Sequence, residues 1–211
     1  EEGSNDAAVV THILDCIVGS VETNGDSTTA RRLLELLAAV IVVANKKKKN
    51  AISIVTRIVA FSECAVESVR SSMTFLIGKL LERFSDDHGE ATYDALQQAL
   101  VARFTDKAVS VRAAAVSCCK VEHDPDITTS KCWILQHDPS ATNRALAAKF
   151  VPISLQTIDY IIHRIRDVKE SVRVAALEAF VGHQGDLEAH HMAAIVQAGW
   201  TERYVIIDEL N

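Results

Sequence analysis

The sequence predicts an all-α fold, a solenoid built from antiparallel helix pairs. The first observation is a seven-residue phrase, an Asp, five residues and an Arg, that occurs three times, at 106–112, 138–144 and 167–173. The second is its spacing: these arginines and that of a fainter copy at 64–70 lie 42, 32 and 29 residues apart, about two helices and two turns. The third is the helical spacing of apolar residues, while nothing alternates as a strand would.

The predicted helices follow in order along the chain. The first spans 7–19, after the cap candidates Ser4, Asn5 and Asp6, and the second spans 29–44 and ends in NKKKKN, where cations favour a helix C-terminus. Five predicted pairs follow: 51–62 with 66–84, 90–104 with 108–120, 128–136 with 140–151, 155–165 with 169–182, and 187–198 with 201–210. We expect one array over 1–211 of about five to six pairs, divergent over 1–63 and recognisable over 64–211.

One of these predicted helices departs from the regular pattern and another illustrates it. The helix at 128–136 is short for a repeat, so its unit is either degenerate or lacks a loop. In 155–165 the apolar residues Leu155, Ile158, Ile161, Ile162 and Ile165 fall at helical spacing from the first residue onward. Turns are indicated where Gly, Pro and Asp gather between the helices, as at 87–89, 123–126 and 137–139.

The repeated phrase has a physical interpretation. Its Asp caps the next helix by accepting hydrogen bonds from free backbone N–H groups, and its Arg reaches the Asp of its own or of a neighbouring repeat. The small residues that follow let two helices approach closely. We therefore assign a structural role, in preference to contact with nucleic acid, to the repeat residues Asp106, Arg112, Asp138, Arg144, Asp167 and Arg173. Asp167 and Arg173 are expected to show coupled losses of stability.

Composition excludes several classes of function. The longest apolar run, 36–44, is far shorter than the ~20 residues that cross a bilayer. Five cysteines, an odd number and scattered, predict reduced thiols and an intracellular protein. The first residue is not Met, so we expect an excerpt from a longer subunit. No P-loop, G-x-S-x-G, H-E-x-x-H or G-x-G-x-x-G is present, and we predict no enzymatic activity, no small-molecule substrate and no cofactor.

A zinc site is the main alternative that the sequence raises, and we predict no metal. Its candidates are Cys118, Cys119, His123, Cys132 and His137. Cys118 and Cys119 are adjacent in a predicted helix, so they point about 100° apart and cannot share one ion easily. The adjacent His190 and His191 face different ways for the same reason, and we interpret them as surface residues. His183 is interpreted as a turn residue.

The net charge is −6, but the basic residues are clustered. Residues 1–26 carry six acids and no base, whereas 101–120 has four bases against one acid and 164–173 has four against two. The cations near helix junctions are candidate phosphate contacts, with a solvated turn as the alternative: Arg103, Lys107, Arg164, Arg166 and Lys169. The run Lys46, Lys47, Lys48 and Lys49 is a further candidate, either for DNA, for an acidic partner or as a solvated loop.

Two blocks resemble a known family. LVARFTDKAVSVRAAAV at 100–116 and IIHRIRDVKESVRVAALEAF at 161–180 are similar to the condensin HEAT-repeat subunit of the CAP-G (Cnd3/Ycg-type) family. The order of AVESVRSSMTFLIGKLL before the first block and VQAGW after the second also fits. The resemblance covers about 64–205, whereas 1–63 matches only as helices and 121–137 departs from the pattern.

The resemblance implies a non-catalytic HEAT-repeat subunit of a chromosome-organising complex. Its expected partners are a kleisin subunit, double-stranded DNA held through its phosphates without sequence preference, and an SMC ATPase heterodimer reached through the kleisin. No membrane partner is expected. The expected location is the nucleus and chromosomes, and the cytoplasm in part of the cell cycle. A HEAT or armadillo scaffold or transport adaptor that binds only protein is the alternative. An enzyme would require a cleft with paired buried carboxylates.

Overall fold

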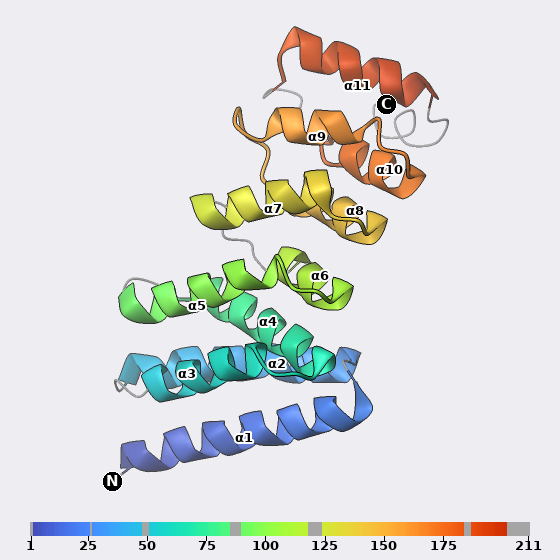
Figure 1. Cartoon of the computed structure of the whole chain (residues 1–211). Coiled ribbons are helices and arrows are strands. Elements are labelled where there is room, and N and C mark those ends of the chain that lie inside the picture. The colour runs from blue at the N-terminus through green and yellow to red at the C-terminus, as the bar shows by residue number, and fades with distance from the viewer. Residues whose placement is uncertain are drawn as a thin grey trace. The chain divides into compact units, whose positions relative to one another are not determined.

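The computed structural model describes residues 2–25, 27–47, 51–84, 90–117, 124–183 and 187–201, and the side chains of slightly shorter stretches. Helices and turns make up these ranges, which contain no strand, so the predicted all-α class is confirmed (Figure 1). No helix in the described ranges is long and apolar enough to span a membrane. The helices are α1 (Glu2–Asn24), α2 (Thr28–Lys47), α3 (Ala51–Ser62), α4 (Glu67–Leu81), α5 (Glu90–Arg103), α6 (Val109–Ser117), α7 (Pro125–His137), α8 (Ala141–Phe150), α9 (Ile158–Arg164), α10 (Glu170–Glu178) and α11 (Ala189–Thr201).

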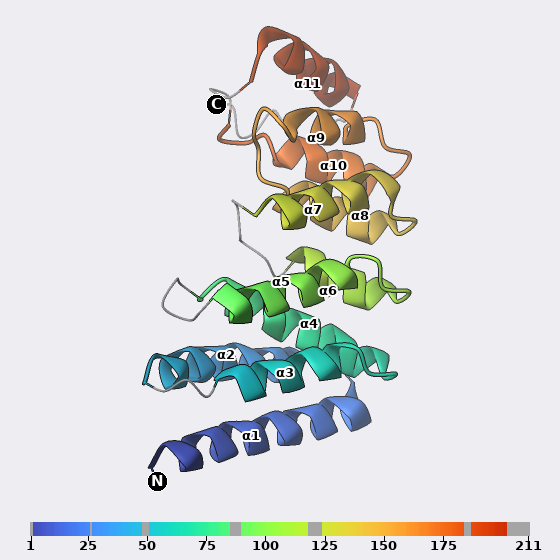
Figure 2. The same ribbon diagram turned by 60° about the vertical axis from the view of Figure 1, so that its left-hand side comes forward.

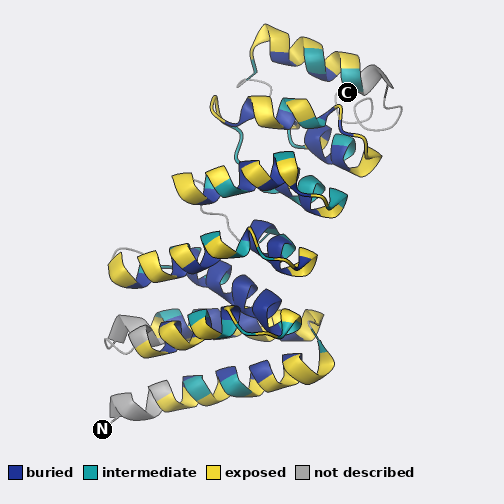
Figure 3. Ribbon diagram, in the orientation of Figure 1, coloured by how far each residue is buried: buried dark blue, intermediate teal, exposed yellow. Residues whose placement is uncertain are grey.

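The chain divides into two compact units, Glu1–Val121 with α1–α6 and Glu122–Asn211 with α7–α11. In unit 1, α4 is the central helix and contacts α1, α2, α3, α5 and α6 (Figure 2). Such a helix must be buried on every side, with its polar side chains hydrogen-bonded or small. Accordingly Met73, Leu76, Ile77 and Leu80 have no exposed surface, and nearly the whole of α4 is buried (Figure 3).

Unit 2 is held together by contacts of α8 with α7 and α10, while α9 contacts α7, α10 and α11. The alanines that follow the repeated arginines are buried in α8 and α10, two helices that contact each other: Ala147, Ala148, Ala175 and Ala176. Side chains this small allow close approach of two helices, which large residues at these positions would prevent. The repeated phrase thus supplies both a turn and a packing surface.

The structure corrects two of the predicted elements in unit 2. Helix α7 begins at Pro125 and has 13 residues, because Asp124 caps it and proline is well tolerated in the first turn, so the helix predicted as 128–136 is not short for a repeat. Helix α9 begins only at Ile158. Its predicted first residue, Leu155, lies in a preceding turn and is 80% exposed. The other bounds within the described ranges agree within a few residues, except that α1 extends well beyond 7–19. The predicted helix 201–210 lies outside the described residues apart from Thr201, the last residue of α11.

Candidate functional site

The arginines of the repeated phrase lie at the junctions between repeats. In unit 1, Arg70 donates from Nε and Nη2 to the carboxylate of Asp106, at 3.0 and 3.1 Å. Its Nη1 donates to the carbonyl oxygens of Cys64 and Ala65, in the turn before its own helix, at 3.0 and 2.8 Å. One guanidinium therefore ties its own turn to the Asp of the next repeat.

Unit 2 repeats this geometry. Arg144 donates from Nε and Nη2 to Asp167, both at 2.9 Å, and from Nη1 to the carbonyl oxygen of Asp138 at 2.8 Å. Arg112 and Arg173 likewise donate from Nη1 to the carbonyl oxygens of Asp106 and Asp167 in their own turns, at 2.7 and 3.0 Å. The carboxylates of Asp106 and Asp167 thus accept hydrogen bonds from the arginine of the preceding repeat.

The Asp side chains shape the turns more than they cap the helices. Asp106 accepts from the N–H of Ala108 at 2.8 Å, and Asp167 from that of Lys169 at 2.9 Å. Each donor is the residue immediately before a helix, α6 or α10, so the bonds close the turn and leave the N–H groups of the first helical turn to other partners. Side-chain capping in the predicted sense is found at Asp124, which accepts from the N–H groups of Asp126 and Ile127.

The environment of these carboxylates keeps them ionised. Burial by itself raises the pKa of Asp106, but hydrogen bonds from Arg70 and from the N–H of Ala108 outweigh it, and the pKa is lowered from its ordinary value. Burial also raises the pKa of Asp167, and the hydrogen bonds from Arg144 and Lys169 again lower it on balance. The pKa values of Arg70 and Arg144 are raised, chiefly by the hydrogen bonds to these two carboxylates.

Two predicted phosphate contacts are tied into the same clusters. Arg103 donates to the carbonyl oxygen of Ser62 at 2.7 Å and lies 3.7 Å from Asp106. Arg164 donates to Asp167 at 3.2 Å. Their side chains are only 16% and 24% exposed. Each is therefore a second guanidinium on a carboxylate that already binds one, a role that the sequence spacing did not reveal.

Three other predicted contacts are exposed. Lys107 lies in the turn before α6, while Arg166 and Lys169 flank Asp167 in the turn before α10. Within the described part of the chain these three cations form no ion pair. Of the lysine run, Lys46 and Lys47 are the last residues of α2, with side chains outside the described set, and Lys48 and Lys49 lie outside the described residues.

The candidate metal ligands are only partly placed. Cys118, Cys119 and His123 lie outside the described residues. Cys132 is buried, which raises the pKa of its thiol to about 11 and makes it a packing residue at neutral pH. Asp159, His190 and His191 do bring ligand atoms within 4.8 Å of one another.

The prediction that His191 is a surface residue is wrong. It is 4% exposed, and its Nδ1 accepts from the N–H of Glu188, the residue before α11, at 3.2 Å. The ring proton is then on Nε2, which lies 3.4 Å from Asp159. A metal at Nε2 would require that proton on Nδ1 and would cost the hydrogen bond from Glu188, so the contacts of His191 are those of a helix cap.

Lys131 is a second residue that sequence reasoning missed. It is 2% exposed, and its Nζ donates to the carbonyl oxygen of Phe150, the last residue of α8, at 3.2 Å. The partial negative charge at a helix C-terminus compensates a buried cation. No sequence signal distinguishes this lysine from a solvated one.

Comparisons with known proteins agree with this architecture. Residues 92–118, which include the Asp106 turn, match the family described as HEAT repeat associated with sister chromatid cohesion. A chain of the crystal structure of the S. pombe condensin Cnd3–Cnd2 subcomplex is similar over 95% of this chain, with a TM-score of 0.70 and 22% identity. The fold is a HEAT-repeat array.

The HEAT array also has a curated relative. It is 23% identical to condensin complex subunit 3 of Homo sapiens over 159 residues, 71% of this chain. The chain spans 16% of the length of that relative and 27% of the S. pombe chain. The resemblance to condensin HEAT subunits inferred from the two sequence blocks is therefore confirmed, for a segment much shorter than either relative.

Proposed function

We propose that this chain is a segment of a condensin-type HEAT-repeat subunit, a non-catalytic scaffold in mitotic chromosome condensation. The observation that carries the proposal is the structural likeness to the Cnd3–Cnd2 subcomplex over 95% of the chain. An independent sequence match to condensin complex subunit 3 supports it. Arrays of helix pairs offer extended surfaces for other macromolecules, which suits such a scaffold.

The proposed partners are a kleisin subunit, double-stranded DNA and, through the kleisin, an SMC ATPase heterodimer. The similar S. pombe chain comes from a subcomplex of Cnd3 with Cnd2, which supports a partner of that type. The proposed place of action is the nucleus and chromosomes, with a cytoplasmic phase in the cell cycle.

The proposed DNA contacts are Lys107, Arg166 and Lys169. They are exposed cations in two corresponding turns, before α6 and before α10. Flexible cations of this kind neutralise phosphates and release counterions without reading sequence. Arg103 and Arg164 are not included, because Asp106 and Asp167 hold their guanidinium groups.

The test measures binding to a fluorescent DNA duplex over a series of salt concentrations, with the chain alone and with a kleisin segment. The triple variant Lys107→Glu/Arg166→Glu/Lys169→Glu should bind more weakly and show a salt slope that is flatter by about 0.9 for each phosphate that is no longer neutralised. The matched control reverses three cations elsewhere, Arg32→Glu/Arg83→Glu/Lys149→Glu, with the same change of charge.

Equal reductions of affinity in both triple variants would show that only net charge matters and would remove the three residues from the interface. Kleisin binding with no DNA binding, even at low salt, would favour a scaffold that binds only protein. Absence of both kleisin binding and DNA binding would contradict the proposal.

A further inference from the structure

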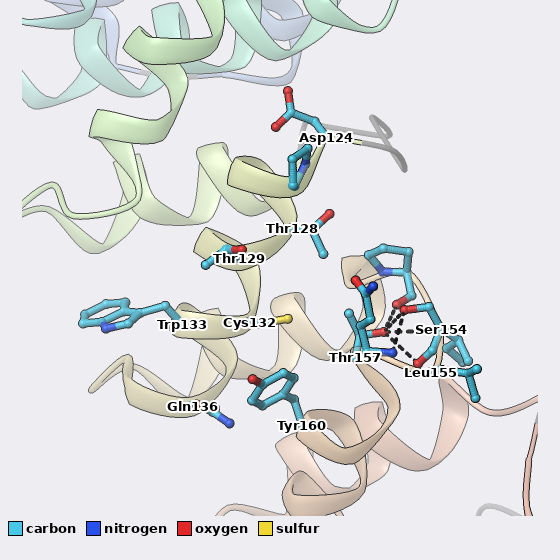
Figure 4. Close-up of a pocket in the computed structure, with 14 residues that line it drawn as sticks. Asp124, Thr128, Thr129, Cys132, Trp133, Gln136, Ser154, Leu155, Thr157 and Tyr160 are labelled. Atoms are coloured by element: carbon cyan, nitrogen blue, oxygen red, sulfur yellow. Dashed lines mark hydrogen bonds between the residues drawn. The ribbon is translucent and has the colours of Figure 1, made fainter.

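A groove of about 960 Å³ lies beside α7 within unit 2 (Figure 4). One wall is α7, from which Cys132 and Gln136 face the groove, and the other is the turn 152–157. Tyr160, from the first turns of α9, lies between them. The turn 152–157, which precedes α9 where the sequence predicted helix from residue 155, therefore forms the second wall of the groove.

The turn that forms the second wall is fixed by hydrogen bonds. Thr157 is 3% exposed; its hydroxyl donates to the carbonyl oxygen of Pro152 and accepts from the N–H of Ser154. Leu155 is held at the tip of this closed turn. A wall that is already ordered costs little conformational entropy when something binds against it.

The groove exposes apolar side chains that a folded domain normally buries. Trp133 is 47% exposed, Leu155 80% and Tyr160 39%. Trp133 packs against His137 one turn later, with ring centroids 5.6 Å apart, which steadies the ring at the rim. Exposed Trp and Tyr beside a groove are typical of protein-binding surfaces, because they bury much area with few rotatable bonds.

The charges of the groove itself favour a protein over a nucleic acid as occupant. None of the 14 residues that line the groove, all between 124 and 160 in the described structure, is a lysine or an arginine. Asp124 is the one acid among them, and its carboxylate caps α7. A phosphate backbone would find no counter-charge in this groove.

A second hollow, lined by three arginines and two aspartates, adjoins the groove at Gln136. Gln136 also lines this hollow of about 340 Å³, formed with Arg144, Arg164, Arg166, Asp138 and Asp167. Asp167 binds Arg144 and Arg164, whereas Arg166 is exposed and makes no ion pair within the described residues. The end of the groove therefore offers one guanidinium to a negative group.

We propose that this groove binds an extended peptide segment of a partner protein, with apolar side chains against Trp133, Leu155 and Tyr160 and an Asp or Glu that pairs with Arg166. The amide of Gln136, placed between the apolar and cationic parts, can hydrogen-bond to the peptide backbone. The proposal rests on unit 2 alone and requires neither DNA nor kleisin binding.

The test is selection of peptides from a displayed random library of 16-residue sequences on the whole chain. Selected peptides should combine an acidic residue with aliphatic or aromatic residues. Affinity is then measured by the fluorescence of Trp133 in a Trp200→Phe background, since the chain has two tryptophans. For the variants Trp133→Ala and Tyr160→Ala, affinity is measured with a fluorescently labelled peptide, because Trp133 fluorescence is lost in the first. Each variant should bind the peptide at least tenfold more weakly.

Charge exchange tests the cationic end. Arg166→Glu should weaken binding at least tenfold and should be rescued by a peptide whose acid is replaced by Lys. Leu36→Ala is the matched control for the two aromatic substitutions. Leu36 is an apolar residue of α2, in the other unit, and is 62% exposed, as against 47% for Trp133, so its loss should have no effect on peptide binding. Thermal unfolding of each variant confirms that the fold is intact.

Several results would overturn the proposal. One is failure to enrich any peptide; another is binding that survives the Trp133→Ala/Tyr160→Ala double substitution or that needs no acid in the peptide. Loss of duplex-DNA binding on substitution of the two aromatic residues would identify the groove as a nucleic-acid surface instead. Arg166 belongs to both proposed surfaces. The variant Lys107→Glu/Lys169→Glu, which retains Arg166, should lower DNA binding and keep peptide binding, so it tests the two functions separately.

Discussion

Arg144 and Asp167 are 23 residues apart in the chain, yet the guanidinium donates two hydrogen bonds of 2.9 Å to the carboxylate. Both side chains are largely buried, with 11% and 3% of their surface exposed. The third guanidinium nitrogen, Nη1, donates to the carbonyl oxygen of Asp138. The link therefore joins the α7–α8 turn to the α9–α10 turn, and Arg70 with Asp106 forms the equivalent link in unit 1.

The first prediction concerns this link. Arg144→Ala and Asp167→Ala should each destabilise the protein. Asp167→Ala leaves the buried guanidinium of Arg144 without its carboxylate, at a cost of roughly 3–5 kcal/mol. Arg144→Ala should cost less, because Asp167 keeps its contact with Arg164. In a double-mutant cycle their coupling energy should be about 1–3 kcal/mol. Urea unfolding of the four proteins gives this value. The pairing of Asp167 with Arg173, expected from the sequence, should show less coupling, because Arg173 binds the carbonyl oxygen that alanine retains.

The control is the exposed ion pair Lys149–Glu178, whose side chains are 52% and 46% exposed. Such pairs contribute about 0–1 kcal/mol. If the Arg144–Asp167 cycle gave a coupling no larger than this pair, the link would not hold the repeats together.

The second prediction separates structural from binding arginines. Arg164→Gln removes a hydrogen bond to Asp167 and should lower the free energy of unfolding by about 1.5–3 kcal/mol, the value for bonds to charged groups. Arg166→Gln, two residues later and exposed, should change it by less than about 0.5 kcal/mol. Binding to duplex DNA should fall more for Arg166→Gln than for Arg164→Gln. The reverse order would return Arg164 to the interface.

The third prediction is a dependence of stability on acid pH. Because the pKa of Asp167 is lowered below its ordinary 3.8 in the folded protein, its ionised form stabilises the fold above that pH. This contribution is lost as the pH falls through the folded pKa. Asp167→Asn should therefore reduce the loss of stability between pH 5 and 3, measured by urea unfolding. Asp159→Asn, whose side chain is 74% exposed, should leave that loss unchanged.

Most of the fold followed from the sequence, because helix periodicity and turn residues are local signals. The bounds of α3 and α5 agree closely with the predicted 51–62 and 90–104. The wrong start predicted for α9 also has a local cause. In 155–165 the apolar spacing begins within a turn that Thr157 closes by hydrogen bonds, and apolar periodicity does not distinguish such a turn from a helix.

The site was predicted less well, because it depends on contacts distant in sequence. The partner of Arg144 is 23 residues away and that of Arg70 is 36 residues away, and both pairings require the packed repeats. Arg103 and Arg166 are both basic residues near a turn in the sequence. The fold holds the first against Asp106 and leaves the second exposed.

The fourth prediction concerns the cap formed by His191. His191→Ala removes the acceptor for the N–H of Glu188 and should speed amide hydrogen exchange throughout the first turn of α11. His191→Gln keeps an acceptor at this third helical position and should retain most of the protection. His190→Ala, with a side chain 67% exposed, is the control. Equal exchange in all three variants would show that the ring does not cap the helix.

The last prediction compares two thiols. Burial raises the pKa of Cys132 to about 11, so that little thiolate is present at pH 8, whereas Cys16 is exposed. Iodoacetamide at pH 8 should therefore alkylate Cys16 well before Cys132, as followed by mass spectrometry of the peptides. In urea the two rates should converge, because unfolding exposes the buried thiol. Rapid alkylation of Cys132 in the folded protein would mean that reagent reaches its thiol from the groove, and the assignment of Cys132 as a packing residue would then be wrong.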